Sequence, residues 1–354
     1  MAGEYEDIAC MVREFAEKEI REAVPEDDLY PDTGFREPLY ARAGEVGFLS
    51  LLVPEDAGGP GECPAALAEV LYELSRVDAS VAAVFFCQAF AHSVLCAAGR
   101  ADLAAAEGLI ASTVYDDPLD LAGGLSAAEG PDGWLLSGSC EDVALGPVAA
   151  SLLLPASTGD GTALFLVPVG EEVRLSEPLL TLGLRACPLC DISLDSAPAT
   201  LVASGTAALD AYVGSVGLMR GPAAAISAGI TAGSLKEGLE YCRGRYQGYK
   251  LIIDHEQMRA ELGRIRAEAL ASRELFRSAC RDGGADGGSL GLAVQLLAGE
   301  MAARATTDGV QVLGGYGYCH DCGQEKRMRD AKQAQCFFGC KELMLQDLTA
   351  AALA

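Results

Sequence analysis

The stretch that decides the fold is QVLGGYGYCHDCGQEKRMRDAKQAQCFFGC, residues 311–340. It opens with an apolar run and two adjacent glycines, passes through many charged and amide side chains, and ends in Phe337, Phe338, Gly339 and Cys340. Charged residues that lead into a short aromatic and glycine segment are typical of the entrance to a chemical site. A phenyl ring, however, has no proton to exchange, so Phe338 cannot act as an acid or a base.

Length, composition and charge limit the possible functions. The chain has 354 residues, half of them hydrophobic, and a net charge of −25. A large core is therefore expected, whereas nucleic acid and anionic membranes would be repelled. The first twenty residues alternate charged and apolar side chains at helical spacing, unlike a signal peptide, and no run approaches the length needed to span a bilayer. We expect a soluble, cytoplasmic protein.

The hydrophobic period changes twice along the chain. Residues 1–110 have helical periodicity, interrupted by the Gly/Pro-rich loop GFLSLLVPEDAGGPG. Residues 111–205 contain short β-rich runs, such as GWLLSGS and ALFLVPV, separated by turn signals. Residues 206–354 are again helical, and we expect apolar stripes there, one of which includes Leu290, Val294 and Leu297, to form a core. The prediction is a helical domain, a small β domain and a helical bundle, with boundaries at these residues.

The thirteen cysteines are expected to be thiols in a reducing compartment. Two pairs, Cys187 with Cys190 and Cys319 with Cys322, have spacings found in zinc and iron sites. Because the pairs lie far apart in the chain and nothing in the sequence brings them together, we predict no metal site.

Three segments together resemble the acyl-CoA dehydrogenase flavoprotein family. They are QVLGGYGY followed by RMRDAK, the strand-like GLRACPLCDISLD, and the N-terminal loop LLVPEDAGGPG. The resemblance covers nearly the whole chain. It implies a mainly α fold with a central β-barrel-like domain and a C-terminal four-helix bundle, FAD as cofactor, and a tetramer. Members of this family oxidise acyl-CoA thioesters with a glutamate base and usually pass electrons to an electron-transfer flavoprotein.

The resemblance places no base in this chain. RDAK is followed in the family by YEGT, whose glutamate is the usual base, and Phe338 occupies that position here. The family's second location is the residue before an arginine that matches Arg220, and here it is Met219. We therefore predict no catalytic residue. Glu342, one helical turn beyond Phe338, is the fallback candidate.

The FAD contacts that the family makes across a dimer interface are largely retained. Arg245 and Gln247 match an R-x-Q motif whose guanidinium suits a pyrophosphate, although the usual Phe-Gly has become Gly-Tyr in this chain. Gln311, Gly314 and Gly315 match a Q-x-x-G-G motif in which missing Cβ atoms let the backbone approach the dinucleotide. The resemblance implies that these residues contact the FAD of a partner subunit.

The contacts that the family makes to FAD within one subunit are altered. The loop TEPGAGSD is replaced by YDDPLDLAGG, which carries Asp116, Asp117 and Asp120, and these carboxylates would repel a pyrophosphate. The W-I-T strand is replaced by residues 142–144, Asp-Val-Ala, and Cys340 replaces the threonine of YEGT. We expect the chain's own FAD site to be degenerate.

Three hypotheses remain open from the sequence. The first is a non-catalytic subunit that supplies FAD contacts to a catalytic acyl-CoA dehydrogenase paralogue in a heterotetramer, with electron-transfer flavoprotein as a further partner. The second is an active divergent dehydrogenase or enoyl-CoA reductase with its acid or base relocated to Glu342, Asp142 or Asp254. The third is a flavin-free binding or scaffold protein. The first hypothesis accounts for the missing base and the altered FAD contacts within the subunit, and also for the retained contacts across the dimer interface.

Overall fold

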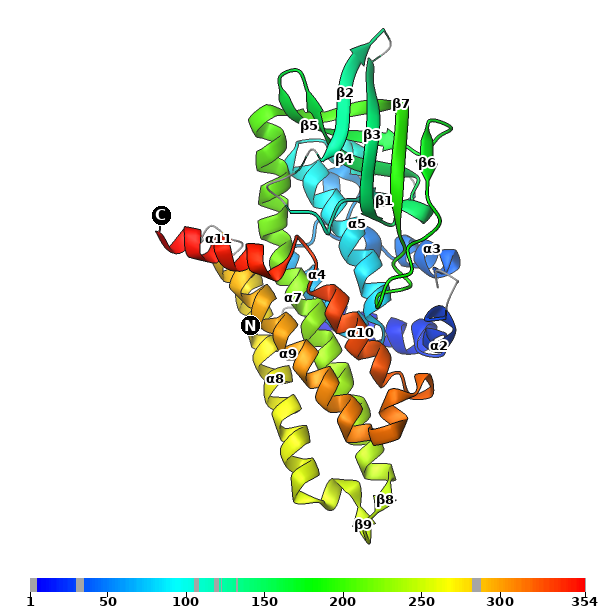
Figure 1. Ribbon diagram of the computed structural model, residues 1–354, viewed down its shortest axis with the longest axis vertical. Helices are drawn as coiled ribbons and strands as arrows, with labels where there is room; N and C mark the ends of the chain where they lie inside the picture. Colours follow the sequence, from blue (N-terminus) through cyan, green and yellow to red (C-terminus); the bar gives the residue numbers. More distant parts are fainter. Residues whose placement is uncertain are drawn as a thin grey trace.

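The computed structural model describes residues 5–29, 35–104, 108–117, 121, 123–131, 133–281 and 288–353. Figure 1 shows a β domain at one end of the molecule, a long helical bundle extending away from it, and N-terminal helices beside both. The predicted fold class, mainly α with a central β domain and a C-terminal bundle, is confirmed.

The N-terminal region is helical and ends in a buried core helix. Its elements are α1 (Glu6–Phe15), η1 (Ala16–Ile20), α2 (Val24–Asp27), α3 (Glu37–Glu45), η2 (Phe48–Ser50), η3 (Glu55–Ala57), α4 (Pro64–Ser75), α5 (Ala79–Ala97) and α6 (Ala101–Ala104). Asp78 begins α5 as its N-cap, and its side chain accepts hydrogen bonds from the amides of Ser80 and Val81.

The expectation that no run reaches the length of a membrane span is wrong for α5. Among the described residues this one helix, 19 residues long, is long and apolar enough to cross a bilayer. Within the protein, 94% of the apolar window is buried. A core helix enclosed on all sides has the same composition as a spanning helix, because both meet only apolar surroundings.

The β domain is a seven-stranded sheet that closes on itself. Its elements are β1 (Ile110–Ser112), β2 (Gly124–Gly130), β3 (Gly133–Ala144), η4 (Gly146–Val148), β4 (Ser151–Thr158), β5 (Gly161–Pro168), β6 (Val173–Leu175) and β7 (Leu189–Ser204). The strand order is β1-β3-β2-β4-β5-β7-β6, and β3 also pairs with β7. This extra pairing closes a ring of strands, which accounts for the barrel-like form.

The C-terminal region is a bundle of long helices. Its elements are α7 (Gly205–Gly244), β8 (Tyr246–Gln247), β9 (Lys250–Leu251), η5 (Ile252–Asp254), α8 (Glu256–Arg281), α9 (Ser289–Leu313), η6 (Gly314–Tyr318), η7 (His320–Cys322), α10 (Gln324–Ala334) and α11 (Lys341–Leu353). Small residues permit close packing: a Cβ on Gly229 of α7 would lie 2.4 Å from the carbonyl oxygen of Tyr72 in α4.

The predicted core stripe on α9 is wrong at Leu297, which is 46% exposed. The buried face of α9 carries Leu292 and Val294 together with small residues, among them Ala298, Gly299 and Ala302. Gly299 lies close to Gln335, just beyond α10. The buried face of α9 therefore combines large and small residues, and Leu297 lies outside it.

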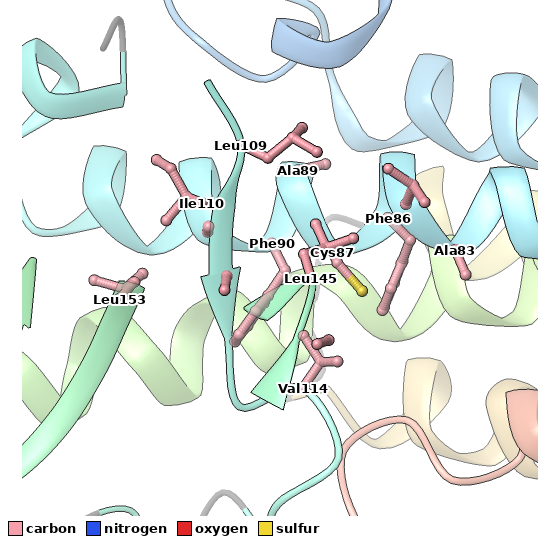
Figure 2. Packing of buried hydrophobic residues seen from close by; sticks show 14 of the residues in the cluster. Ala83, Phe86, Cys87, Ala89, Phe90, Leu109, Ile110, Val114, Leu145 and Leu153 are labelled. Carbon is pink, nitrogen blue, oxygen red and sulfur yellow. The ribbon is translucent and has the colours of Figure 1, made fainter. Parts of the chain in front are cut away.

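Helix α5 lies at the centre of the molecule, between the β domain and α7 (Figure 1). Figure 2 shows its Phe86, Cys87 and Phe90 packed with Ile110 of β1 and Leu145 beyond β3 in one continuous core. Because this core spans all three regions, the elements around α5 are held in fixed positions. The candidate site lies beside this helix.

Candidate functional site

Phe337 and Phe338 lie inside a cluster of aromatic rings. Both are enclosed, with exposures of 0% and 2%. The Phe337 ring centroid lies 4.5 Å from that of Phe86 and 5.3 Å from that of Tyr115, which is stacked on it. The Phe338 centroid lies 5.1 Å from that of Phe90. We call these five residues, together with Tyr212 against Phe90, the aromatic cluster. The rings fill the space between α5 and α7 where the FFGC segment returns.

The backbone around Phe338 is held in an unusual conformation. Phe338 has φ +63° and Gly339 has φ +103°, in the region that favours glycine. The Phe338 amide donates to the Val114 carbonyl at 2.7 Å. The Gln295 amide nitrogen donates to the Phe337 carbonyl at 2.8 Å. Such a backbone costs about 1–3 kcal/mol and persists only where surrounding contacts enforce it. Here the enforcing contacts are ring packing and two buried hydrogen bonds.

Met219, at the second position where the resemblance would place a base, is also buried. Met219 of α7 is fully enclosed, and its neighbour Arg220 is 6% exposed. Arg220 donates to the Gln295 Oε1 at 2.9 Å, and its guanidinium carbon lies 6.0 Å from the centroid of Phe338. Burial lowers the pKa of Arg220 to about 10, so the side chain remains charged at neutral pH.

The titratable groups of the aromatic cluster are two phenols. Burial raises the pKa of Tyr115 well above its usual value, and it also raises the pKa of Tyr212. The Tyr212 hydroxyl donates to the Thr113 carbonyl at 3.0 Å. Both phenols are therefore neutral and cannot accept a proton from a substrate carbon at neutral pH. The sequence did not predict that four other rings surround the two phenylalanines. These rings, Phe86, Phe90, Tyr115 and Tyr212, come from three segments that lie far apart in the chain.

The fallback carboxylates lie outside this cluster. Glu342 is exposed in the first turn of α11. Asp142 is exposed near the end of β3, at φ +55° beside a register shift. Asp254 is exposed in η5 and pairs with Arg259 at 3.2 Å. Each is on a different element and faces solvent, so the structure does not bring them to Phe338 or to one another.

The residues predicted to face a partner are exposed at the far end of the bundle. They are Arg245, Gln247, Gln311, Gly314 and Gly315. Arg245 directly follows α7, and Gly314 and Gly315 directly follow α9, so both helices end in this region (Figure 1). The Arg245 guanidinium carbon lies 5.5 Å from the ring centroid of Tyr316, which joins the two segments. The aromatic partner Tyr316, 52% exposed, was not predicted.

Acidic residues gather at the segments that replace the family's FAD loop and strand. Burial, together with the charges of Asp116, Asp142, Glu141 and Asp191, raises the pKa of Cys140 to about 12. Asp117 is also partly buried nearby in the chain, and Asp120 lies outside the described residues. The potential here is negative and disfavours a bound anion.

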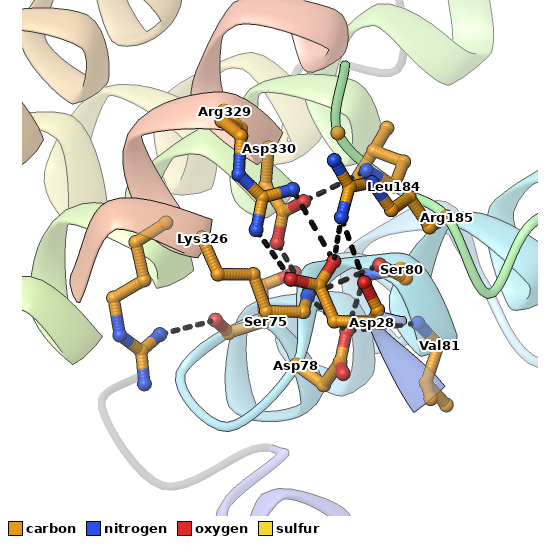
Figure 3. A network of polar contacts seen from close by, with 12 residues as sticks. Asp28, Ser75, Asp78, Ser80, Val81, Leu184, Arg185, Lys326, Arg329 and Asp330 are labelled. Atoms are coloured by element: carbon orange, nitrogen blue, oxygen red, sulfur yellow. Dashed lines mark hydrogen bonds and ion pairs between the residues drawn. The ribbon is translucent and has the colours of Figure 1, made fainter. Parts of the chain in front are cut away.

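A buried ionic network positions α10 and the segment after it (Figure 3). Lys326 lies 3.1 Å from the Asp78 carboxylate and 2.7 Å from that of Asp330. Asp330 accepts from the Leu184 amide at 2.7 Å, and Arg329 pairs with Asp28. The two carboxylates raise the pKa of Lys326 despite its burial. Lys326 therefore ties α10 to the N-cap of α5, and Asp330 of the RDAK segment ties it to the β domain. Its partners Asp28 and Asp78 were not predicted.

The two cysteine pairs are not gathered into one cluster in the part of the chain that the structure describes. Cys187 and Cys190 are buried, with the Cys187 sulfur 4.0 Å from that of Cys87, and all thirteen cysteines are free thiols. Asp28, His320 and Glu325 do lie close together, but Arg329 forms ion pairs with both of these carboxylates. An arginine already supplies the positive charge that a metal ion would bring.

Two comparisons by sequence bear on this geometry. Residues 3–105 match the N-terminal domain of acyl-CoA dehydrogenase, and residues 210–353 match its C-terminal domain. The chain belongs to the acyl-CoA dehydrogenase family. The probable acyl-CoA dehydrogenase fadE25 of Mycobacterium leprae (strain TN) is 26% identical over 376 residues, covering 96% of this chain and 93% of that protein. The cyclohex-1-ene-1-carbonyl-CoA dehydrogenase of Syntrophus aciditrophicus (strain SB) is 27% identical over 359 residues, covering 94% and 86%.

The fold agrees with solved members of the acyl-CoA dehydrogenase family. Butyryl-CoA dehydrogenase from Megasphaera elsdenii superposes with a TM-score of 0.88 at 21% identity, covering 99% of this chain and 98% of that one. At this identity the likeness shows the fold alone. What the aromatic cluster and the exposed end of the bundle do in this family member is a separate question.

Proposed function

We propose that this chain is a non-catalytic subunit of a heteromeric acyl-CoA dehydrogenase. The observation that carries the proposal is the burial of Phe338 among aromatic rings. By register with the family, Phe338 replaces the general base, and Met219 replaces it at the alternative location. A proton acceptor within hydrogen-bond reach of the substrate carbon is needed for dehydrogenation, and the aromatic cluster offers none at neutral pH.

The residues at the chain's own expected FAD site do not suit the cofactor. The loop and strand that would hold the cofactor carry Asp116, Asp117, Glu141 and Asp142, and Asp191 is an additional charge beside Cys140. Like-charge repulsion from these carboxylates would destabilise a bound pyrophosphate. Accordingly, we assign no reaction step to these segments.

The far end of the bundle fits FAD held by a partner. Arg245 is exposed and offers a planar guanidinium suited to bidentate contact with a pyrophosphate. Gln311 is exposed beside Gly314 and Gly315, where the absence of side chains leaves room for a dinucleotide. FAD bound by the partner would accept the substrate hydride. This chain's residues would anchor the cofactor's phosphates and adenosine.

The proposed partner is a catalytic acyl-CoA dehydrogenase paralogue, with an acyl-CoA thioester as the substrate of the complex and an electron-transfer flavoprotein as its electron acceptor. Removing one active site from each heterodimer leaves volume for a bulky acyl group. Some relatives are named for cyclic substrates, such as cyclohex-1-ene-1-carbonyl-CoA dehydrogenase. The thirteen free thiols favour a reducing, cytoplasmic location.

The alternative of an active enzyme with a relocated base has less support. Glu342, Asp142 and Asp254 are all exposed to solvent. A base that abstracts a carbon-bound proton acts best when water is excluded from it. No separate observation favours the scaffold hypothesis.

A substitution experiment in the reconstituted complex tests the proposal. We expect replacement of the paralogue's catalytic glutamate by glutamine to abolish acyl-CoA oxidation. Replacing Glu342 of this chain by glutamine should leave kcat unchanged. Loss of kcat in Glu342→Gln, with the assembly intact, would contradict the proposal and support a relocated base.

A further inference from the structure

One face of helix α5 packs into the aromatic cluster, and the opposite face carries polar side chains that line a cavity. Phe86 and Phe90 point into the aromatic cluster. Gln88 and His92, about half a turn away on the same helix, line a cavity of about 820 Å³ on the other side. This cavity lies between α5, α3 and the loop that contains η2 and η3. It is separate from the residues assigned to FAD or to a partner.

The walls of this cavity are mainly apolar. They include Phe35, Tyr40, Leu49, Val53 and Leu109. Among the described residues that line it, Glu37 is the only charged one, and none is lysine or arginine. An anion would therefore find no counter-charge and would meet a carboxylate at the exposed Glu37.

The polar end of the cavity is an ordered pair of side chains. The Gln88 Oε1 accepts from the Ile110 amide at 2.8 Å, so its amide nitrogen donates to the His92 Nε2, also at 2.8 Å. The His92 proton must then be on Nδ1. That nitrogen is enclosed and has no hydrogen-bond partner among the described residues. His92 is neutral, because burial lowers its pKa to about 4.

We propose that this cavity binds an uncharged, mainly apolar small molecule that carries a hydrogen-bond acceptor. Its volume is in the range of ligand sites, and its combination of apolar walls with a few polar groups is typical of them. The acceptor would lie at the Gln88–His92 end and would accept the Nδ1 hydrogen of His92, while Nε2 keeps its hydrogen bond to Gln88. The proposal is independent of the chain's role in dehydrogenation.

The first test measures binding of 1-tetralone to the purified protein by equilibrium dialysis. Tetralin, which lacks the carbonyl, and tetralin-1-carboxylate, which adds a negative charge, are matched controls. We expect tetralone to bind about fivefold more tightly than tetralin, the factor expected for one neutral hydrogen bond. The carboxylate should bind more weakly than either. Equal binding of the carboxylate, or no saturable binding of tetralone at millimolar concentration, would overturn the proposal.

The second test locates the site. Ala41→Trp and Ala57→Trp place an indole in the cavity from positions that are not fully buried, and both should abolish saturable tetralone binding. Ala207→Trp, at an exposed position on α7, is the control and should bind normally. The chain has three histidines, so ¹⁵N-histidine NMR can resolve His92. Tetralone should shift its Nδ1 resonance. An unchanged resonance, or normal binding in both tryptophan variants, would contradict the assignment.

Discussion

Truncating Phe338 tests whether the FFGC segment is a packing element. The ring is 2% exposed and lies 5.1 Å from Phe90 and 5.6 Å from Phe86, centroid to centroid. Phe338→Ala should therefore destabilise the protein by about 3–5 kcal/mol, as for other enclosed phenylalanines. Phe338→Gly removes the same ring but also relieves the backbone at φ +63°. It should be about 1 kcal/mol more stable than Phe338→Ala.

The assay is urea unfolding followed by circular dichroism, comparing variants that share one m-value. Phe276 provides the matched control, because it is 0% exposed within helix α8. There glycine should be less stable than alanine by about 1 kcal/mol, the usual helix preference. The sign of the glycine–alanine difference should therefore reverse between the two positions. A loss below about 1 kcal/mol for Phe338→Ala, or the same sign at both positions, would refute the reasoning.

Three further predictions follow from other contacts. Lys326→Met leaves two buried carboxylates without a cation and should cost about 3–5 kcal/mol in urea unfolding, whereas Lys341→Met, on the surface, should leave the unfolding midpoint almost unchanged. Arg245→Ala should weaken FAD binding by the heteromeric complex about 10- to 100-fold in a fluorescence titration, and the neighbouring exposed Arg243→Ala should not. Burial holds the pKa of His92 at about 4, below the 6.5 of an unfolded chain, so the unfolded state binds the proton first. Stability should fall by up to about 3 kcal/mol from pH 6.5 to 4, and His92→Leu should flatten that slope.

Much of the fold could be predicted because the hydrophobic period is local information. The change from helical to alternating patterns marked the β region, and the segments on either side of it are helical. The position of Leu297 could not be predicted, since spacing alone does not tell whether a helix buries its large or its small residues. In α9 both kinds are buried, and Gly309 approaches Ser234 of α7 and Gln324 of α10.

The candidate site was predictable in part. Residue types showed that Phe338 and Met219 cannot exchange a proton, and motif register gave the candidates at the far end of the bundle. The rings of Phe86, Phe90 and Tyr212 around Phe338 depend on how α5 and α7 cross, which no short motif records. Likewise, the ion pair of Lys326 with Asp78 joins residues from opposite ends of the chain.

The ratio of FAD to protein tests the central claim most directly. We expect this chain, purified alone, to be colourless and to contain no FAD. Co-expressed with a catalytic paralogue, it should form a complex with one FAD for every two chains and with acyl-CoA dehydrogenase activity. One tightly bound FAD per copy of the chain purified alone would contradict the account.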